Sequence, residues 1–175
     1  MILTISGLHG TGKSTIAKLI AEKLGLQYYS TGQAFRDLAQ EMNMTLEKFS
    51  EYAEKNPEID KELDSKILGI ARRGNIIIDS QLSGYILKSI TAFKILLICP
   101  LEIRVKRMAE RDNVNYKLKL KETEMREKSE LERFKHLYNI DLGDREEIQD
   151  LYDLIIDTEN LTIEDVLEKI LSTLE

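Results

Sequence analysis

A glycine-rich stretch near the start of the chain decides the fold. It reads Gly7-Leu8-His9-Gly10-Thr11-Gly12-Lys13-Ser14 and matches the pattern G-x-x-x-x-G-K-[ST] at every fixed position. Residues 2–6 before it form a strand-like run, and residues 13–24 after it repeat apolar side chains at helical spacing. A strand, this loop and a helix in succession are typical of a phosphate-binding loop, or P-loop. The stretch therefore predicts a site for the phosphates of a nucleoside triphosphate.

The chemistry of the predicted loop depends on its backbone and on two side chains. Glycines allow successive N–H groups to turn toward phosphate oxygens, and the N-terminus of the following helix adds partial positive charge. Lys13 can reach the β- and γ-phosphates, and Ser14 can bind Mg²⁺. His9 is interpreted as a variable position whose backbone matters more than its imidazole. The expected ATP-binding residues are Gly7, Leu8, His9, Gly10, Thr11, Gly12, Lys13, Ser14 and Thr15.

Strand-like and helix-like stretches alternate along the rest of the chain. Strands are expected at residues 2–6, 27–29, 76–78, 93–98 and 152–156, and helices at 13–24, 32–42, 45–53, 57–73, 101–111, 117–138 and from 162 onward. Asn56 is expected to cap the helix that begins at Pro57, and Gly25 and Gly74 are expected to end helices. The alternation predicts an α/β fold with a mainly parallel sheet and helices on both faces.

Composition narrows the class of protein. The chain has 175 residues and a net charge of −6, which suits one domain and argues against a general nucleic-acid binder. Its apolar runs are too short to span a membrane, and Met1 leads directly into a strand rather than a signal peptide. Cys99 is the single cysteine, so an internal disulfide is excluded. We expect a cytoplasmic monomer without nucleic-acid or membrane partners.

Two features indicate a small kinase rather than another P-loop protein. The N-K-x-D motif of GTPases is missing from the sequence, and a large ATPase would need a longer chain. A small kinase needs a second phosphate pocket for the acceptor and a cationic lid that excludes water. Arg36, which ends the stretch 30–36, can offer two parallel hydrogen bonds to such a phosphate. It could equally be a surface arginine after a helix N-cap, and its spacing alone does not decide between the two.

Asp79 and the later arginines are further candidates. Asp79 ends the strand at 76–78, where a carboxylate near the P-loop can hold a water of Mg²⁺. Arg126 and Arg133 share one helical face, and Glu130 between them is expected to hold both. Arg104, Arg107 and Arg111 form another group at helical spacing. The expected catalytic residues are Lys13, Asp79, Arg126 and Arg133, and the expected metal site is Ser14 with Asp79 acting through water.

These motifs resemble those of the cytidylate kinases, particularly the short archaeal type. The resemblance rests on residues 7–14, 30–36, 56–64, 126–133, 138–141 and 156–158. It implies one P-loop kinase domain with a five-stranded parallel sheet between helical layers. The core would span residues 1–30, 74–112 and 139–175, the nucleoside-monophosphate-binding region about 31–73, and a helical lid about 113–130.

The resemblance also implies an activity and an acceptor site. The activity would be Mg²⁺-dependent transfer of the γ-phosphoryl group of ATP to CMP or dCMP, giving ADP and CDP or dCDP. Arg36 would contact the acceptor phosphate, and Arg126 and Arg133 would clamp the phosphates of both nucleotides. The implied acceptor-binding residues are Thr31, Gly32, Arg36, Gln81, Gly84, Arg126 and Arg133.

Two positions depart from the family pattern. Gln81 stands where the family usually has an arginine on the acceptor phosphate, and Leu131 stands where many relatives have a further arginine. A neutral amide donates weaker hydrogen bonds to phosphate than a guanidinium does, so either acceptor binding is weaker or the other arginines compensate. Two alternatives stay open: a kinase for another acceptor, such as AMP, UMP or a small alcohol, and a nucleotide-binding regulatory module with little turnover.

Overall fold

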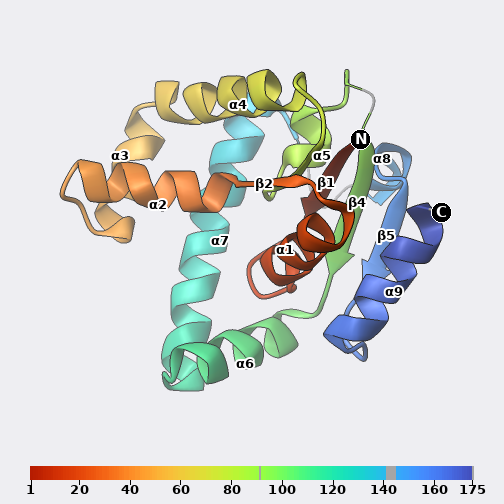
Figure 1. Ribbon diagram of the computed structural model, residues 1–175. Helices are drawn as coiled ribbons and strands as arrows, with labels where there is room; N and C mark the ends of the chain where they lie inside the picture. The colour runs from red at the N-terminus through yellow and green to blue at the C-terminus, as the bar shows by residue number, and fades with distance from the viewer. Residues whose placement is uncertain (91, 141–144, 175) are drawn as a thin grey trace.

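Helices and strands alternate along the chain, as Figure 1 shows. The computed structural model describes residues 1–90, 92–140 and 145–174, without the side chains of residues 145–147. The strands are β1 (Ile2–Ser6), β2 (Gln27–Ser30), β3 (Ile76–Asp79), β4 (Phe93–Ile98) and β5 (Leu154–Asp157). The helices are α1 (Lys13–Leu24), α2 (Thr31–Glu41), α3 (Leu46–Lys55), α4 (Glu58–Ala71), α5 (Ser83–Ile86), α6 (Leu101–Asp112), α7 (Tyr116–Tyr138), α8 (Arg145–Leu151) and α9 (Ile163–Leu174).

The strands form one parallel five-stranded sheet in the order β2-β3-β1-β4-β5, so the predicted fold class is confirmed. The central strand β1 pairs with β3 on one side and β4 on the other, and Ile5 lies opposite Asp79. Because the strands are parallel, the P-loop after β1 and the end of β3 reach the same edge of the sheet.

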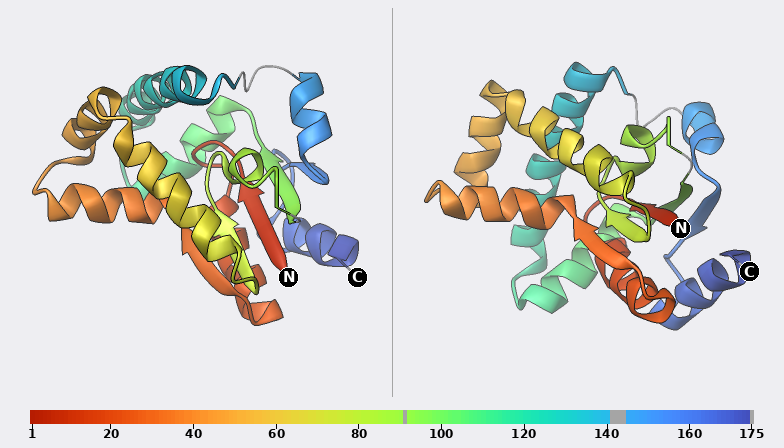
Figure 2. Two further views of the ribbon diagram at one scale, coloured as in Figure 1. Left: turned by 90° about the horizontal axis from the view of Figure 1, so that it is seen from above. Right: turned by 45° about the horizontal axis from the view of Figure 1, so that its top comes forward.

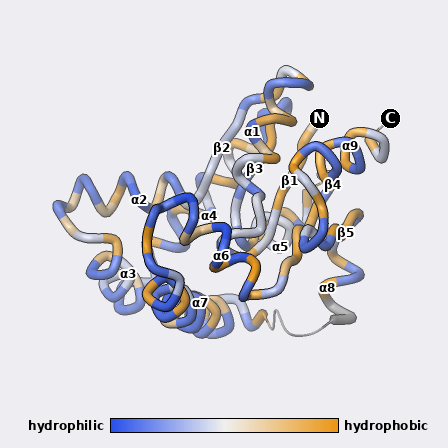
Figure 3. The backbone as a smooth tube through the Cα atoms, turned by 90° about the horizontal axis from the view of Figure 1, so that it is seen from below, coloured by the Kyte–Doolittle hydropathy of each residue, from blue (hydrophilic) through white to orange (hydrophobic). Residues whose placement is uncertain are grey.

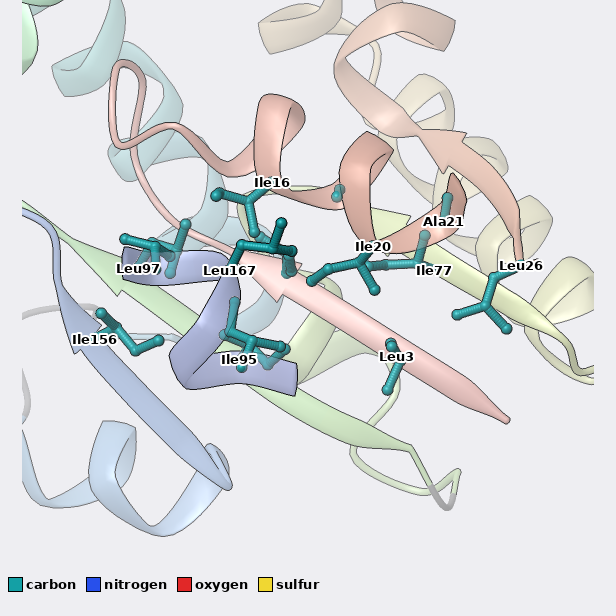
Figure 4. Packing of buried hydrophobic residues seen from close by; sticks show 14 residues of the cluster. Leu3, Ile16, Ile20, Ala21, Leu26, Ile77, Ile95, Leu97, Ile156 and Leu167 are labelled. Carbon is teal, nitrogen blue, oxygen red and sulfur yellow. The ribbon is translucent and has the colours of Figure 1, made fainter. Parts of the chain in front are cut away.

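Apolar helices cover both faces of the sheet. On one face, Ile16 and Ile20 of α1 and Leu167 of α9 pack against strand residues such as Leu3 and Ile95 (Figure 4). On the other face, α4 and the segment around α5 pack against β3. Strands that are buried on both sides need apolar residues at successive positions, and Ile76, Ile77 and Ile78 are almost completely inaccessible to solvent.

A helical arm extends from the edge of the sheet. Helices α2, α3 and α4 project to one side, and α7 runs beside them after a hairpin with α6 (Figures 1 and 2). Phe35 of α2 and Phe49 of α3 pack with ring centroids 4.7 Å apart. Both α2 and α3 carry hydrophilic and hydrophobic residues in turn (Figure 3), as expected of helices that bury one side. Residues of α2, α4 and α7 line one cleft together with residues of the P-loop.

Most predicted helix ends are confirmed. Gly25 caps α1 in the left-handed conformation, with φ of 63°, and Thr162 and Asp165 exchange hydrogen bonds at the start of α9. The cap predicted at Asn56 is wrong, because its side chain donates to the Tyr52 carbonyl and so closes α3. The helices α5 and α8 were not predicted. Asp141, part of the family pattern, lies outside the described residues.

The sequence predicts that the apolar runs of the chain are too short to span a membrane. Within the described ranges, every helix is too short or too polar to cross a bilayer.

Gly84 gives a test of the packing between α5 and Tyr152, which lies between α8 and β5. A Cβ atom at this buried position would overlap the ring of Tyr152. We expect Gly84→Ala to lower the free energy of unfolding by about 1–3 kcal/mol, because neighbouring groups must shift. Gly69→Ala is the control, since an added Cβ there meets no atom within 4 Å, and we expect it to be neutral or stabilising by up to about 1 kcal/mol. Urea unfolding measures both; equal effects would contradict the packing described.

Candidate active site

The P-loop has the backbone geometry that phosphate binding needs. Gly10 has φ of 82°, and a Cβ there would lie 2.7 Å from the Arg104 carbonyl oxygen, so only glycine fits without strain. Gly12 has φ of 91° and caps α1, with no atom within 4 Å of a Cβ built there. The N-terminus of α1 therefore faces open space that an anion can enter. Thr11 closes the loop, since its Oγ1 donates to the Leu8 carbonyl over 2.9 Å.

Lys13 and Asp79 meet at the carboxyl edge of the sheet. The Lys13 ammonium donates to the Leu8 carbonyl over 3.3 Å, and burial lowers its pKa, against the opposing charges of Asp79 and Glu130. Asp79 is buried, and its Oδ2 accepts a hydrogen bond of 2.9 Å from the Tyr28 hydroxyl. Burial beside the Asp79 charge raises the pKa of Tyr28 to about 12. The tyrosine thus stays protonated and holds this carboxylate in place.

Ser14 and Asp79 are the available donors for a metal ion. Both line the cleft described below. Within the described part of the chain, no three histidine, cysteine, aspartate or glutamate side chains gather into a metal site. One hydroxyl and one carboxylate suit Mg²⁺, which keeps several waters and takes other ligands from substrate phosphates. The donor set therefore fits a magnesium ion that enters with a nucleotide.

His9 does more than the sequence analysis expected of it. Its Nε2 lies 2.7 Å from Glu130 Oε2 and 2.8 Å from Gln81 Nε2. Gln81 Nε2 also donates to Glu130 Oε2 over 2.7 Å, and Arg126 Nε lies 3.0 Å from Glu130 Oε1. Burial lowers the pKa of His9, although Glu130 opposes this effect. The imidazole is therefore neutral near pH 7 and joins the P-loop to α7.

The group of arginines on α6 does not act as one cationic patch. Arg104 is buried, pairs with Glu127 of α7 and donates to the His9 carbonyl over 2.8 Å. Arg107 donates to the Thr158 carbonyl over 2.6 Å. Only Arg111 lines the cleft. Arg104 and Arg107 are thus engaged in fixing the P-loop and the end of β5.

Arg133 lies with a group of acidic and aromatic residues between α4 and α7. Its Nε is 2.9 Å from Asp60 Oδ2, and its guanidinium lies 5.7 Å from the Phe35 ring centre. The prediction that Glu130 holds both arginines is therefore wrong, since Glu130 pairs with Arg126 while Arg133 pairs with Asp60. The Arg133 side chain is only 8% exposed, and among the described atoms its Nη1 has no hydrogen-bond partner. This buried nitrogen therefore has unused hydrogen-bonding capacity in a residue that lines the cleft.

Asp64 lies one turn beyond Asp60 on the same face of α4. The Tyr138 hydroxyl donates to it. Burial raises the pKa of Asp64 to about 6, against the hydrogen bond from Tyr138 and with a further contribution from the charge of Asp60. Neither Asp60 nor Asp64 was predicted as a site residue from the sequence. The four-residue spacing of Asp60 and Asp64, which places two carboxylates on one helical face, was the available signal.

The other predicted acceptor residues divide into two groups. Thr31, Gly32, Arg36 and Gln81 line the cleft that contains the P-loop. In this structure Arg36 donates a hydrogen bond of 3.1 Å to Gln33 Oε1. The Thr31 hydroxyl is buried and has no partner among the described atoms. Gly84 does not line the cleft, because it lies beneath Tyr152 with its amide donating to Ser6 Oγ. Its place indicates packing rather than contact with an acceptor.

One cleft of about 570 Å³ joins these parts. It runs from the P-loop, past the turn after β3, to the space between α2, α4 and α7. The predicted site residues that line it are His9, Gly10, Gly12, Lys13, Ser14, Thr15, Thr31, Gly32, Arg36, Asp79, Gln81, Arg126 and Arg133. The predicted ATP-binding residues Gly7, Leu8 and Thr11 do not line the cleft. Two anionic groups could therefore meet between Lys13 and the arginines.

Solved structures support the fold alone. An uncharacterised protein from Eubacterium ventriosum aligns with a TM-score of 0.72 and 17% identity over 99% of this chain and 97% of its own. Shikimate kinase from Aquifex aeolicus aligns with a TM-score of 0.60 and 16% identity over 99% and 96%.

Sequence relatives are much closer. The chain is 42% identical to the cytidylate kinase of Methanocaldococcus jannaschii over 178 aligned positions, which cover 100% of this chain and 98% of the relative. It is also 42% identical to the cytidylate kinase of Aeropyrum pernix, with 95% of each chain covered. The family model described as "Cytidylate kinase-like family" matches residues 2–160. The chain belongs to the cytidylate kinase-like family.

Proposed function

We propose that this protein transfers the γ-phosphoryl group of ATP to CMP, giving ADP and CDP, and that dCMP is a second acceptor. The observation that carries the proposal is the single cleft lined by the P-loop lysine Lys13, by Arg36 on α2 and by Arg126 on α7. These cations come from a donor side, an acceptor side and a covering helix. The names of the full-length relatives support CMP as the acceptor.

The donor side follows from the P-loop. Backbone N–H groups of residues 7–15 and the ammonium of Lys13 bind the ATP phosphates. Ser14 would hold Mg²⁺, with Asp79 acting through water. When bound, the ion neutralises phosphate charge. Tyr28 keeps Asp79 oriented through its hydrogen bond of 2.9 Å.

The acceptor side supplies the nucleophile. Arg36 and the buried hydroxyl of Thr31 bind the CMP phosphate, one oxygen of which attacks the γ-phosphorus of ATP. A new P–O bond forms to that oxygen, and the bond to the leaving ADP breaks. No general base is required, because the attacking oxygen is already ionised. Arg126 stabilises the charge on the transferring group.

Two regions serve binding and closure in this proposal. Residues 31–73 hold the acceptor, and a lid of about residues 113–130 covers the phosphates and excludes water. The helix α7 continues without a break to Tyr138, so its last two turns belong to the acceptor side. The proposal includes a cytoplasmic monomer without nucleic-acid or membrane partners, since a net charge of −6 offers no general basic surface.

The acidic end of the cleft supports cytosine as the base. Asp60 and Asp64 offer carboxylate oxygens there, and Arg133 offers donors. Cytosine presents an amino group, which a carboxylate can accept, beside a ring nitrogen and a carbonyl oxygen that a guanidinium can serve. Uracil presents a carbonyl oxygen in place of the amino group and would face a carboxylate unfavourably. We therefore assign the base to this end.

Acceptor-dependent ADP release tests the function. We expect turnover with CMP and dCMP, and much less with UMP, AMP or shikimate. Lys13→Ala should lower kcat/KM at least about 100-fold, because the lysine stabilises phosphate charge. Its melting temperature should stay near that of the wild type, since Lys13 contributes little packing.

Two results would contradict this function. Preferred turnover of another acceptor would support the alternative kinase. ATP binding without stimulation by any acceptor would support the regulatory module.

Base selection gives a separate prediction. Asp64→Asn should reduce the ratio of kcat/KM for CMP to that for UMP about tenfold, since an amide can donate to the uracil carbonyl whereas the carboxylate cannot. In the wild type the same ratio should fall as pH drops below about 6, where Asp64 takes up a proton. CMP and UMP carry the same kind of phosphate group. Its titration therefore affects both values of kcat/KM alike and cancels in the ratio. An unchanged ratio in the variant would place base recognition elsewhere.

A further inference from the structure

The Glu130 carboxylate is the meeting point of three elements around the cleft. Its Oε2 lies 2.7 Å from His9 Nε2 of the P-loop and 2.7 Å from Gln81 Nε2 after β3. Its Oε1 lies 3.0 Å from Arg126 Nε on α7. The Glu130 side chain is only 10% exposed. One side chain thus connects the donor side, the turn after β3 and the helix that covers the cleft.

The hydrogen-bond chemistry of this meeting point is determined by Glu130. Burial acts to raise its pKa, but His9, Arg126 and Gln81 outweigh burial and lower the pKa to about 2. An ionised carboxylate can only accept hydrogen bonds. His9 must therefore carry its proton on Nε2 and donate it to Oε2, as Gln81 Nε2 also does. The 2.8 Å between these two nitrogens is then a contact between two donors that share one acceptor, not a hydrogen bond. Neither donor needs a positive charge to make this contact.

A buried negative charge beside a phosphate cleft needs a reason, because it repels the substrates. Its contact with Arg126 supplies one. The ion pair uses Nε, and among the described residues it leaves the two terminal amino groups of Arg126 available for phosphate oxygens. Since Gln81 is neutral, it helps to fix Glu130 without competing with Arg126 for the carboxylate charge. The carboxylate can therefore orient the guanidinium without occupying its phosphate-binding face.

We propose that Glu130 is a positioning residue for phosphoryl transfer, which aims Arg126 at the transferring group and is itself held by His9 and Gln81. This inference rests on the proposed function. It gives the His9 side chain a role that its place in the glycine-rich loop does not require. Because His9 holds Glu130, the orientation of Arg126 also depends on the P-loop. The ATP-binding loop and the covering helix α7 are therefore aligned with each other.

A double-mutant cycle separates positioning from a general structural effect. Glu130→Gln keeps the size of the side chain but removes its charge and one acceptor oxygen, so that its N–H₂ must face a donor, either Arg126 Nε or the pair His9 and Gln81. With saturating ATP and CMP, we expect kcat to fall about 10- to 100-fold, since small displacements of a catalytic group cost this much. The KM for ATP should change less than about twofold. In an Arg126→Ala background, Glu130→Gln should lower kcat by less than about twofold further, because Glu130 acts through Arg126.

The control is Glu132→Gln, which changes an exposed glutamate on the same helix and should leave kcat unchanged. If Glu130→Gln does not fold, as judged by its melting curve, His9→Asn takes its place in the same cycle. Equal losses of kcat in both backgrounds, or no loss in either, would overturn the positioning role. A wild type without acceptor-dependent ADP release would instead contradict the proposed function on which the inference rests.

Discussion

The pairing of β1 between β3 and β4 is the constraint on which the site depends. Parallel strands bring the P-loop and Asp79 to one edge of the sheet, with Ile5 opposite Asp79 in the register. The phosphate-binding loop, the metal-binding candidates and the turn that carries Gln81 therefore share one place before any side-chain contact forms. The packing of α1 and α9 against one face of the sheet and of α4 against the other secures this arrangement.

Two glutamates on α7 attach the covering helix to the P-loop. Glu127 pairs with Arg104, which donates to the backbone of His9, and Glu130 contacts the His9 side chain. Burying carboxylates is costly unless partners compensate for the lost hydration. Both glutamates have such partners, so they specify where α7 lies more than they add to stability. His9 therefore lies at the connection between the nucleotide loop and Arg126.

The sequence predicted the parts of the structure that depend on local pattern. The P-loop, the strands around it and the closeness of Asp79 follow from apolar periodicity and from the rule that parallel strands end at one edge. The ion-pair partners of Arg126 and Arg133 could not be predicted from local pattern. Helical spacing placed Glu130 within reach of both Arg126 and Arg133, but Asp60 on a distant helix takes Arg133. The burial of Gly84 could not be predicted for the same reason, since its neighbour Tyr152 comes from a remote segment.

The proposed reaction is transfer of a phosphoryl group between two nucleotides that are held in one cleft. The most direct measurement follows the label from ATP carrying ³²P at the γ-position, mixed with CMP and Mg²⁺, and separates the products. We expect the label to appear in the β-phosphate of CDP in proportion to the ADP formed. Label found only in inorganic phosphate, or only in ATP, would contradict it.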